Sequence, residues 1–256
     1  DMCPSADAAR ALLTDRTRAI VLVTPNNPTG AEYDGATIQA FFDLARDHGL
    51  TLLVDETYRD FHSATPGTPL HPLFNDPDWS DTLISLYSFS KAYRLTGHRV
   101  GAMIASSARL AEVEKFLDTV AICPNQLGQR AALWGMQNLG DWLAGERLEI
   151  LDRRAAIHDH FAPLAENGWQ ILGCGAYFAY LRHPLQMPSE RLAPALVDAA
   201  RVLSLPGTMF MPPEDPAGSA QLRIAFANID RAQIETLVAR LAKVTDETLA
   251  AGATLA

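Results

Sequence analysis

Residues 88–101 read SFSKAYRLTGHRVG and follow an apolar run, residues 82–87, whose pattern predicts a buried strand. A lysine between small hydroxyl residues just past a strand end is unusual if it has only a surface role. An amine held in a polar pocket can form a Schiff base with an aldehyde cofactor or a carbonyl substrate. The neighbouring serines and Arg99 offer hydrogen bonds and positive charge for a phosphate group. A covalent site at Lys91 is our working hypothesis; the simpler alternative is a solvated loop lysine.

The composition limits the class of protein. At 256 residues the chain can form one large domain or two ordinary ones. Its 48% hydrophobic and 20% charged residues are typical of a soluble globular protein. The formal net charge of -9 argues against nucleic acid as a partner, because no basic stripe offsets it. No apolar run approaches the ~20 residues that cross a bilayer, and no signal peptide opens the chain, so we expect no membrane partner.

The cysteines and histidines give no pattern of a metal or disulfide site. Cys3, Cys123 and Cys174 are widely spaced and odd in number, which fits neither a disulfide framework nor a zinc cluster. The seven histidines show no ligand spacing for a metal. We therefore expect a cytoplasmic protein, in a reducing compartment, without a bound metal.

The first part of the chain alternates strand and helix patterns. The apolar run 19–24 predicts a strand covered on both faces, and it ends at the dense turn signal PNNPTG, residues 25–30. Asp34 can cap the helix that follows, which stops at residues 48–49. A second buried strand is expected at residues 50–54. Strand, helix and strand predict a right-handed parallel crossover.

Polar residues follow the ends of three expected strands. Asn27, Asp55 and Lys91 each lie just past an apolar run, and a further strand is expected at residues 100–105. In open α/β sheets, ligands bind beyond the carboxyl ends of the strands. The three residues could therefore share one site.

The second part of the chain predicts helices and short strands in an α+β arrangement. A long charged helix, about residues 142–165, can bridge two domains, and we place the boundary within it. The expected domains are 1–145, part of a large domain, and 146–256, a smaller α+β domain. The chain also reads as if it begins partway through a domain, so we expect an upstream segment. The other expected elements are helices 108–120, 126–138, 189–200 and 231–245, and strands 169–172, 176–181, 202–205 and 221–225.

Four short motifs, in this order, resemble those of class I/II aminotransferases, pyridoxal-phosphate enzymes of fold type I. They are PNNPTG at 25–30, DETY at 55–58, SFSK at 88–91 with Arg99, and LRIAF at 222–226. The resemblance extends over nearly the whole chain. It implies an α/β fold, a mostly parallel sheet sandwiched by helices and incomplete at its N-terminus, with a smaller C-terminal α+β domain. It also implies a homodimer.

The resemblance implies a role for each residue that would contact the ring of the cofactor. Lys91 would form the Schiff base with pyridoxal phosphate and later carry a proton between the substrate Cα and the cofactor. Asp55 would hydrogen-bond the pyridine nitrogen and keep it protonated, so that the ring accepts electrons. Asn27 and Tyr58 would hydrogen-bond the phenolic oxygen, which favours the deprotonated Schiff base. Each has a simpler alternative: a turn residue for Asn27, a helix cap for Asp55 and a core side chain for Tyr58.

The resemblance also implies anion-binding residues. Ser88, Ser90 and Arg99 would hold the cofactor phosphate. Arg223, from the second domain, would clamp the substrate carboxylate in a bidentate fashion, with Asn27 beside the substrate. Arg223 could instead pair with a surface acid. The ring-stacking aromatic and further phosphate ligands of the family cannot be located and would lie upstream of the first residue.

The implied function is transfer of an amino group between an amino acid and a 2-oxo acid. Two alternatives stay open at this point. One is a pyridoxal-phosphate β-lyase acting on sulfur amino acids, because the shared motifs do not separate elimination from transamination. The other is an aminotransferase-like regulatory domain that binds the cofactor. The sequence does not indicate which amino acid or 2-oxo acid is used.

Overall fold

The computed structural model describes residues 2–64, 66–252 and 254, which form two compact units. The first, here called the Lys91 unit, comprises Cys3–Pro25 and Glu32–Arg147. The second, here called the Arg223 unit, comprises Asn26–Ala31 and the described residues from Leu148 onward, together with Met2. The turn 26–31 therefore groups with the second half of the chain, which its position in the sequence does not indicate.

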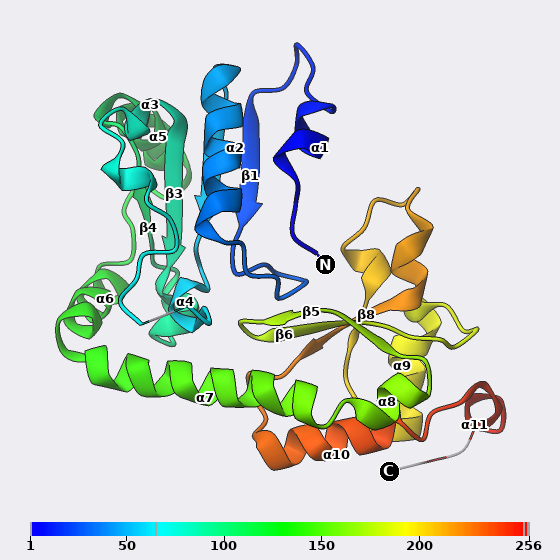
Figure 1. Cartoon of the computed structure of the whole chain (residues 1–256). Helices are drawn as coiled ribbons and strands as arrows, with labels where there is room; N and C mark the ends of the chain where they lie inside the picture. The colour runs from blue at the N-terminus through cyan, green and yellow to red at the C-terminus, as the bar shows by residue number, and fades with distance from the viewer. Residues whose placement is uncertain (1, 65, 253, 255–256) are drawn as a thin grey trace. The chain divides into compact units, whose positions relative to one another are not determined.

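The Lys91 unit is built on a four-stranded sheet in the order β1-β2-β3-β4 (Figure 1). The strands β1, β2 and β3 run parallel, and β4 is antiparallel to β3. The carboxyl ends of the three parallel strands therefore meet at one edge of the sheet. The strands are β1 (Ala19–Val23), β2 (Thr51–Asp55), β3 (Leu83–Ser88) and β4 (Gly101–Ile104). The helices are α1 (Ala6–Arg10), α2 (Gly35–Asp47), α3 (Trp79–Thr82), α4 (Phe89–Ala92), α5 (Ser107–Val120), α6 (Gln126–Asn138) and the first part of α7 (Gly140–Asp159).

The helix α2 forms for the reason that its sequence indicates. The carboxylate of Asp34 accepts a hydrogen bond from the Thr37 amide at 2.7 Å and satisfies one of the unpaired N–H groups of the first turn. This bond also lowers the pKa of Asp34. The apolar positions expected at helical spacing are buried and lie against β1 and β2: Ile38, Phe41, Phe42, Leu44 and Ala45.

The strand β1 was expected to be covered on both faces, and the structure differs from this expectation. Val21 in β1 is 62% exposed, and all four residues of β4 are exposed, so neither strand is covered on both faces within the described part of the chain. The helices α5 and α6 also present large apolar side chains to solvent, with Phe116 65% and Trp134 57% exposed. Apolar continuity in a sequence predicts a strand but not how many neighbours cover it.

Residues 88–101, here called the lysine stretch, lie on a small core of their own. Tyr87 and Phe89 pack with Val100 and with Ala132 of α6. The helix α6 approaches this stretch closely, because a Cβ at Gly135 would lie only 2.8 Å from a ring carbon of Tyr93. Gly135, which belongs to no phosphate-loop pattern, therefore has a packing role.

The Arg223 unit contains a second four-stranded sheet, antiparallel throughout, in the order β5-β6-β8-β7. The expected helix 142–165 ends earlier, at Asp159, and a new helix starts at Ala162 with Pro163 in its first turn, where a missing N–H is tolerated. Of the expected strand 202–205 only Leu205 lies in a strand, the two-residue strand β7. The strands are β5 (Gln170–Gly175), β6 (Phe178–Arg182), β7 (Leu205–Pro206) and β8 (Gln221–Ala225). The helices are the end of α7, α8 (Ala162–Glu166), α9 (Ser189–Ala200), α10 (Arg231–Leu241) and α11 (Asp246–Ala250).

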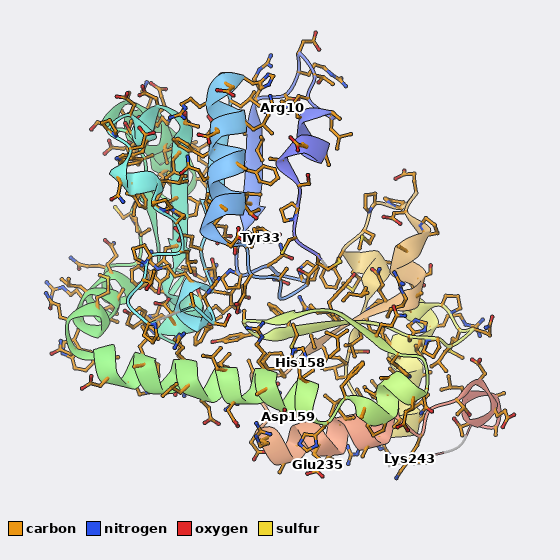
Figure 2. All side chains as sticks on the ribbon, in the orientation of Figure 1. Arg10, Tyr33, His158, Asp159, Glu235 and Lys243 are labelled. Carbon is orange, nitrogen blue, oxygen red and sulfur yellow. The ribbon has the colours of Figure 1, made fainter. Side chains whose placement is uncertain are left out.

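An arginine ties α10 to the end of α7. Arg231, the first residue of α10, donates to Asp152 at 2.8 Å and to Asp159 at 2.9 Å (Figure 2, where Asp159 is labelled). These hydrogen bonds lower the pKa of Asp152. Because all three side chains are substantially exposed, the pairs fix the direction of α10 more than they stabilise the fold.

Candidate active site

Asp55 lies at the carboxyl end of β2, in register with Leu86 of β3. Its Oδ1 atom accepts two hydrogen bonds from Thr57, from the amide at 2.9 Å and from the hydroxyl at 2.6 Å. No described residue donates to its second carboxylate oxygen. Asp55 therefore does not cap a helix, as the simpler alternative required: Thr57 orients the carboxylate and leaves one oxygen able to accept an N–H from a ligand.

Lys91 lies in the short helix α4, directly after β3. The sequence contains three lysines, and the other two, Lys115 and Lys243, are exposed, whereas Lys91 is half-buried. Its Nζ atom lies 5.9 Å from the ring centroid of Tyr58, a side chain that is only 5% exposed. The Lys91 unit thus brings together the amine, the phenol and the end of β2 that carries Asp55.

The expected phosphate-binding residues form a connected group around α4. Ser88 caps this helix, since its Oγ accepts from the Ser90 amide at 3.2 Å. A hydroxyl that accepts in this way still has its own O–H to donate. Thr96 donates to the Ser90 carbonyl at 3.0 Å, and Arg99 donates to the Thr96 carbonyl at 2.9 Å. Arg99 is exposed and has a positive φ of 52°, at the end of the short 3-10 turn Thr96–His98.

Arg223 and Asn27 lie together in the Arg223 unit, although 196 residues separate them. The Nη1 atom of Arg223 donates to Oδ1 of Asn27 at 2.8 Å. The guanidinium carbon lies 4.7 Å from the ring centroid of Phe178 and 4.9 Å from that of Phe210. Stacking against two rings and bonding to an amide hold the guanidinium in one orientation. With Oδ1 bonded to Arg223, the amide nitrogen of Asn27 is the atom that can donate to a ligand.

The turn that carries Asn27 is fixed on the β5–β6 hairpin. Asn26 accepts from the amide of Thr29 at 3.1 Å and from its hydroxyl at 2.8 Å, and the Asn27–Pro28 peptide bond is cis. Gly30 has a φ of +72°, and a Cβ at this position would lie 2.4 Å from the Gly175 amide nitrogen. Only glycine allows this backbone conformation and this approach. The turn motif therefore has both a structural reason and a side chain that faces Arg223.

Sequence reasoning missed several residues around these groups. Thr57 was noted only as part of a motif, and Phe210 was not singled out, because no local signal connects a ring in a turn with an arginine in the next strand. Arg94, which lies three residues after Lys91, pairs with Glu146 at 2.6 Å. Among the described residues, no group of three or more histidine, cysteine or acidic side chains could hold a metal ion. None of the described helices is both long and apolar enough to span a membrane.

Known proteins with similar sequence or structure were compared with the chain. It is 27% identical to an aspartate aminotransferase of Sulfolobus acidocaldarius, over 92% of this chain and 58% of that protein. It is 28% identical to aromatic-amino-acid aminotransferase 2 of Thermococcus litoralis, over 95% of this chain and 61% of that protein. The structure of an aromatic aminotransferase from Pyrococcus horikoshii superposes with a TM-score of 0.81 and 26% identity, covering 95% of this chain and 64% of that one.

The chain thus spans about 60% of the length of these relatives. The model of one protein family, described as aminotransferase class I and II, matches residues 3–241. This match confirms the resemblance inferred from the four motifs, and the similar solved structures confirm the fold class, with a mostly parallel sheet that is incomplete relative to theirs. The chain belongs to the class I and II aminotransferase family.

Proposed function

We propose that the protein containing this chain is an aminotransferase, which moves an amino group between an amino acid and a 2-oxo acid with pyridoxal phosphate bound to Lys91. Enzymes of this family use that cofactor. The observation that carries the proposal is the grouping of Lys91, Tyr58 and Asp55 at the carboxyl ends of β2 and β3. These are an amine, a phenol and a carboxylate, the three kinds of group that an aldehyde-bearing pyridine ring requires.

The residues present fit the cofactor. Bound pyridoxal phosphate supplies an electron sink for the charge left when the bond to the α-hydrogen of the substrate is broken. The second carboxylate oxygen of Asp55 can accept a hydrogen bond from the protonated ring nitrogen, because Thr57 donates only to Oδ1. The hydroxyl of Ser88 and the guanidinium of Arg99 can donate to phosphate oxygens, and Ser90 holds the turn between them.

The chemical roles follow from the properties of each side chain. Lys91 would hold the aldehyde carbon through its Nζ atom, and the same amine would take and return the proton at the substrate Cα. The negative charge of Asp55 would keep the ring nitrogen protonated. Tyr58 would donate its phenol O–H to the cofactor oxygen, which would favour the deprotonated form of the bond to Lys91.

Arg223 binds the α-carboxylate of the substrate in this proposal. A guanidinium matches a carboxylate in shape and charge, and the rings of Phe178 and Phe210 favour a fixed plane for it. Asn27 bonds to the same arginine and presents its amide nitrogen as a donor. The relatives act on different substrates by their names, aspartate in one and aromatic amino acids in another, so the side-chain preference of this protein stays open.

The comparisons favour transamination over both alternatives, because the similar proteins described above are named aminotransferases rather than lyases or regulators. From the same resemblance we infer a homodimer, and from the cysteine pattern a cytoplasmic location. The odd number and wide spacing of the three cysteines are compatible with a reducing compartment. The molar mass of the purified protein in solution, measured by light scattering, tests the dimer.

The activity is tested with the purified full-length protein and a panel of amino acids, each with and without a 2-oxo acid acceptor. An aminotransferase forms the new amino acid only when the acceptor is present. Release of ammonia and pyruvate without an acceptor identifies a β-lyase instead. Cofactor binding without turnover of any amino acid supports the regulatory alternative and contradicts the proposal.

A further inference from the structure

A tyrosine at the end of β3 is bonded to the turn that begins at Tyr58. The hydroxyl of Tyr87 donates to Oδ2 of Asp60 at 2.7 Å. Asp60 lies in the short 3-10 turn Arg59–Phe61, whose first flanking residue is Tyr58. The guanidinium carbon of Arg59 lies 4.2 Å from the ring centroid of Tyr87. Two successive side chains after Tyr58 therefore contact the same ring, which directly precedes the lysine stretch.

The ring of Tyr87 is itself held firmly. It is 8% exposed and meets the ring of Phe89 edge to face, with centroids 5.1 Å apart. Burial and the neighbouring charge of Asp60 raise the pKa of Tyr87 well above its ordinary value. The phenol consequently stays protonated and donates to Asp60 over the whole physiological pH range. A hydrogen bond to a charged acceptor is stronger than one between neutral groups.

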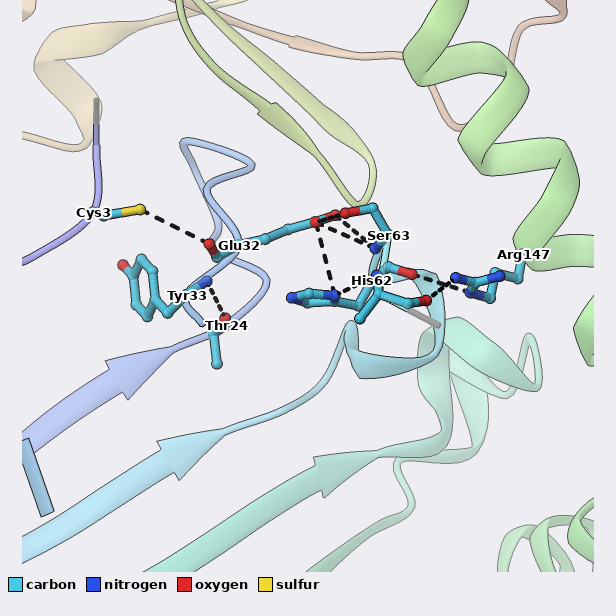
Figure 3. A network of polar contacts seen from close by, with 8 residues as sticks. Cys3, Thr24, Glu32, Tyr33, His62, Ser63 and Arg147 are labelled. Carbon is cyan, nitrogen blue, oxygen red and sulfur yellow. Dashed lines mark hydrogen bonds and ion pairs between the residues drawn. The ribbon is translucent and has the colours of Figure 1, made fainter. Parts of the chain in front are cut away.

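The residues that follow the turn Arg59–Phe61 are also held by hydrogen bonds (Figure 3). The amide of Ser63 donates to both carboxylate oxygens of Glu32 at 3.2 Å. Arg147 donates to the carbonyl of His62 at 3.0 Å and also to the carbonyl of Ala64. The residue pair just before Tyr58 is held by the sheet, because the amide of Glu56 donates to the carbonyl of Leu86 at 2.9 Å. The Tyr87–Asp60 bond adds a second link to β3 just after Tyr58, and so restrains the turn against the end of that strand.

We propose that Tyr87 and Asp60 are positioning residues, which fix the phenol of Tyr58 relative to Lys91. The proposal rests on the function proposed above, in which Tyr58 donates to the cofactor bound at Lys91. Hydrogen bonds weaken steeply when donor and acceptor shift or turn. A displacement of about 1 Å in a positioning group can lower a rate about a hundredfold. Loosening the turn therefore weakens the effect of Tyr58 without removing its hydroxyl.

The first test measures the contact itself by amide hydrogen exchange. Tyr87→Phe removes the hydroxyl and keeps the ring that contacts Arg59 and Phe89. We expect the amides of Arg59 and Phe61 to exchange about tenfold faster in this variant, because they close the turn and a charge-assisted bond to it is lost. The matched control is Tyr180→Phe, which removes another buried tyrosine bond, to Gln221 at 3.0 Å, in the Arg223 unit.

Unchanged exchange at these two amides in Tyr87→Phe would overturn the proposal. Asp60→Asn serves as a second variant at a half-buried position, where folding is less at risk, and it is expected to give the same direction of change. This measurement needs no cofactor, so its result stands even if Lys91 does not bind pyridoxal phosphate.

The second test uses the visible absorbance of the full-length protein loaded with pyridoxal phosphate, titrated with pH. We expect the midpoint of the absorbance change to rise by about half a unit or more in Tyr87→Phe, because a weakened bond from Tyr58 favours the deprotonated form less. Tyr58→Phe should raise it further, and adding Tyr87→Phe to Tyr58→Phe should change nothing more. If Tyr87→Phe shifted the midpoint by the same amount with and without Tyr58→Phe, positioning through Tyr58 would be contradicted. A protein that forms no cofactor adduct contradicts the proposed function, whereas the exchange result still decides the contact.

Discussion

The substitution Arg223→Lys isolates the geometry of the carboxylate clamp from its charge. Lysine keeps the positive charge but loses the planar fork that bonds to Asn27 and stacks between Phe178 and Phe210. Loss of one of two charge-assisted hydrogen bonds to a carboxylate costs about 1.5–3 kcal/mol. Weaker stacking of the cation adds about 0.5–1 kcal/mol. The sum, about 2–4 kcal/mol, corresponds to roughly 30- to 700-fold weaker binding of the carboxylate.

The assay follows binding of an amino acid to the cofactor-loaded, full-length protein, in single-turnover reactions without the 2-oxo acid. We expect the apparent dissociation constant for the amino acid to rise by the factor above while the amount of bound cofactor is unchanged. An amine of the same side chain that lacks the carboxylate should bind equally well to both proteins, because it never engages Arg223. The matched control is Arg231→Lys, in the same unit, where the arginine pairs with Asp152 and Asp159.

Two results would refute the reasoning. If Arg223→Lys changed the binding of the amino acid less than about threefold, a value below 1 kcal/mol, the clamp role would be wrong. If the variant lost its cofactor with its stability unchanged, Arg223 would serve the cofactor and not the substrate.

Two further predictions concern stability. Gly30→Ala should destabilise the Arg223 unit by roughly 3 kcal/mol or more in urea unfolding, because a positive φ is combined with a Cβ 2.4 Å from a backbone nitrogen. The control Gly252→Ala, with φ +63° and nothing within 4 Å of the new Cβ, should cost only about 1 kcal/mol. Equal losses of stability in the two variants would contradict the close approach at Gly30. Burial lowers the pKa of His183 below 6.5, so the unfolded chain binds a proton at this residue before the folded chain does. The free energy of unfolding should therefore fall as the pH drops through about 6.5. His183→Phe should reduce this pH dependence, and an unchanged dependence would contradict a role of His183 in it.

Local patterns were sufficient for much of the fold. Asp34 and the apolar positions of α2 predict that helix because capping and helical spacing are properties of neighbouring residues. The four motifs fix the order of the site residues along the chain. The grouping of Asp55 and Lys91 follows from parallel strands, whose carboxyl ends meet at one edge of the sheet.

Contacts between distant residues were not predictable in the same way. The exposure of Val21 depends on how many neighbours β1 has in space, and a continuous apolar run does not encode that number. The bond between Tyr87 and Asp60 joins residues 27 apart through a fold that must form first. Likewise, Phe210 stacks on Arg223 because a turn brings it there, and no residue pattern marks the pair.

Chemical trapping tests whether Lys91 carries the cofactor. The full-length protein is incubated with pyridoxal phosphate, reduced with borohydride and digested, and the modified peptide is identified by mass spectrometry. We expect the adduct on the half-buried Lys91. It should be lost in Lys91→Ala and retained in Lys115→Ala, whose lysine is exposed and paired with Glu112. An adduct that survives in Lys91→Ala, or that is found on Lys115 or Lys243 in its place, would contradict this expectation.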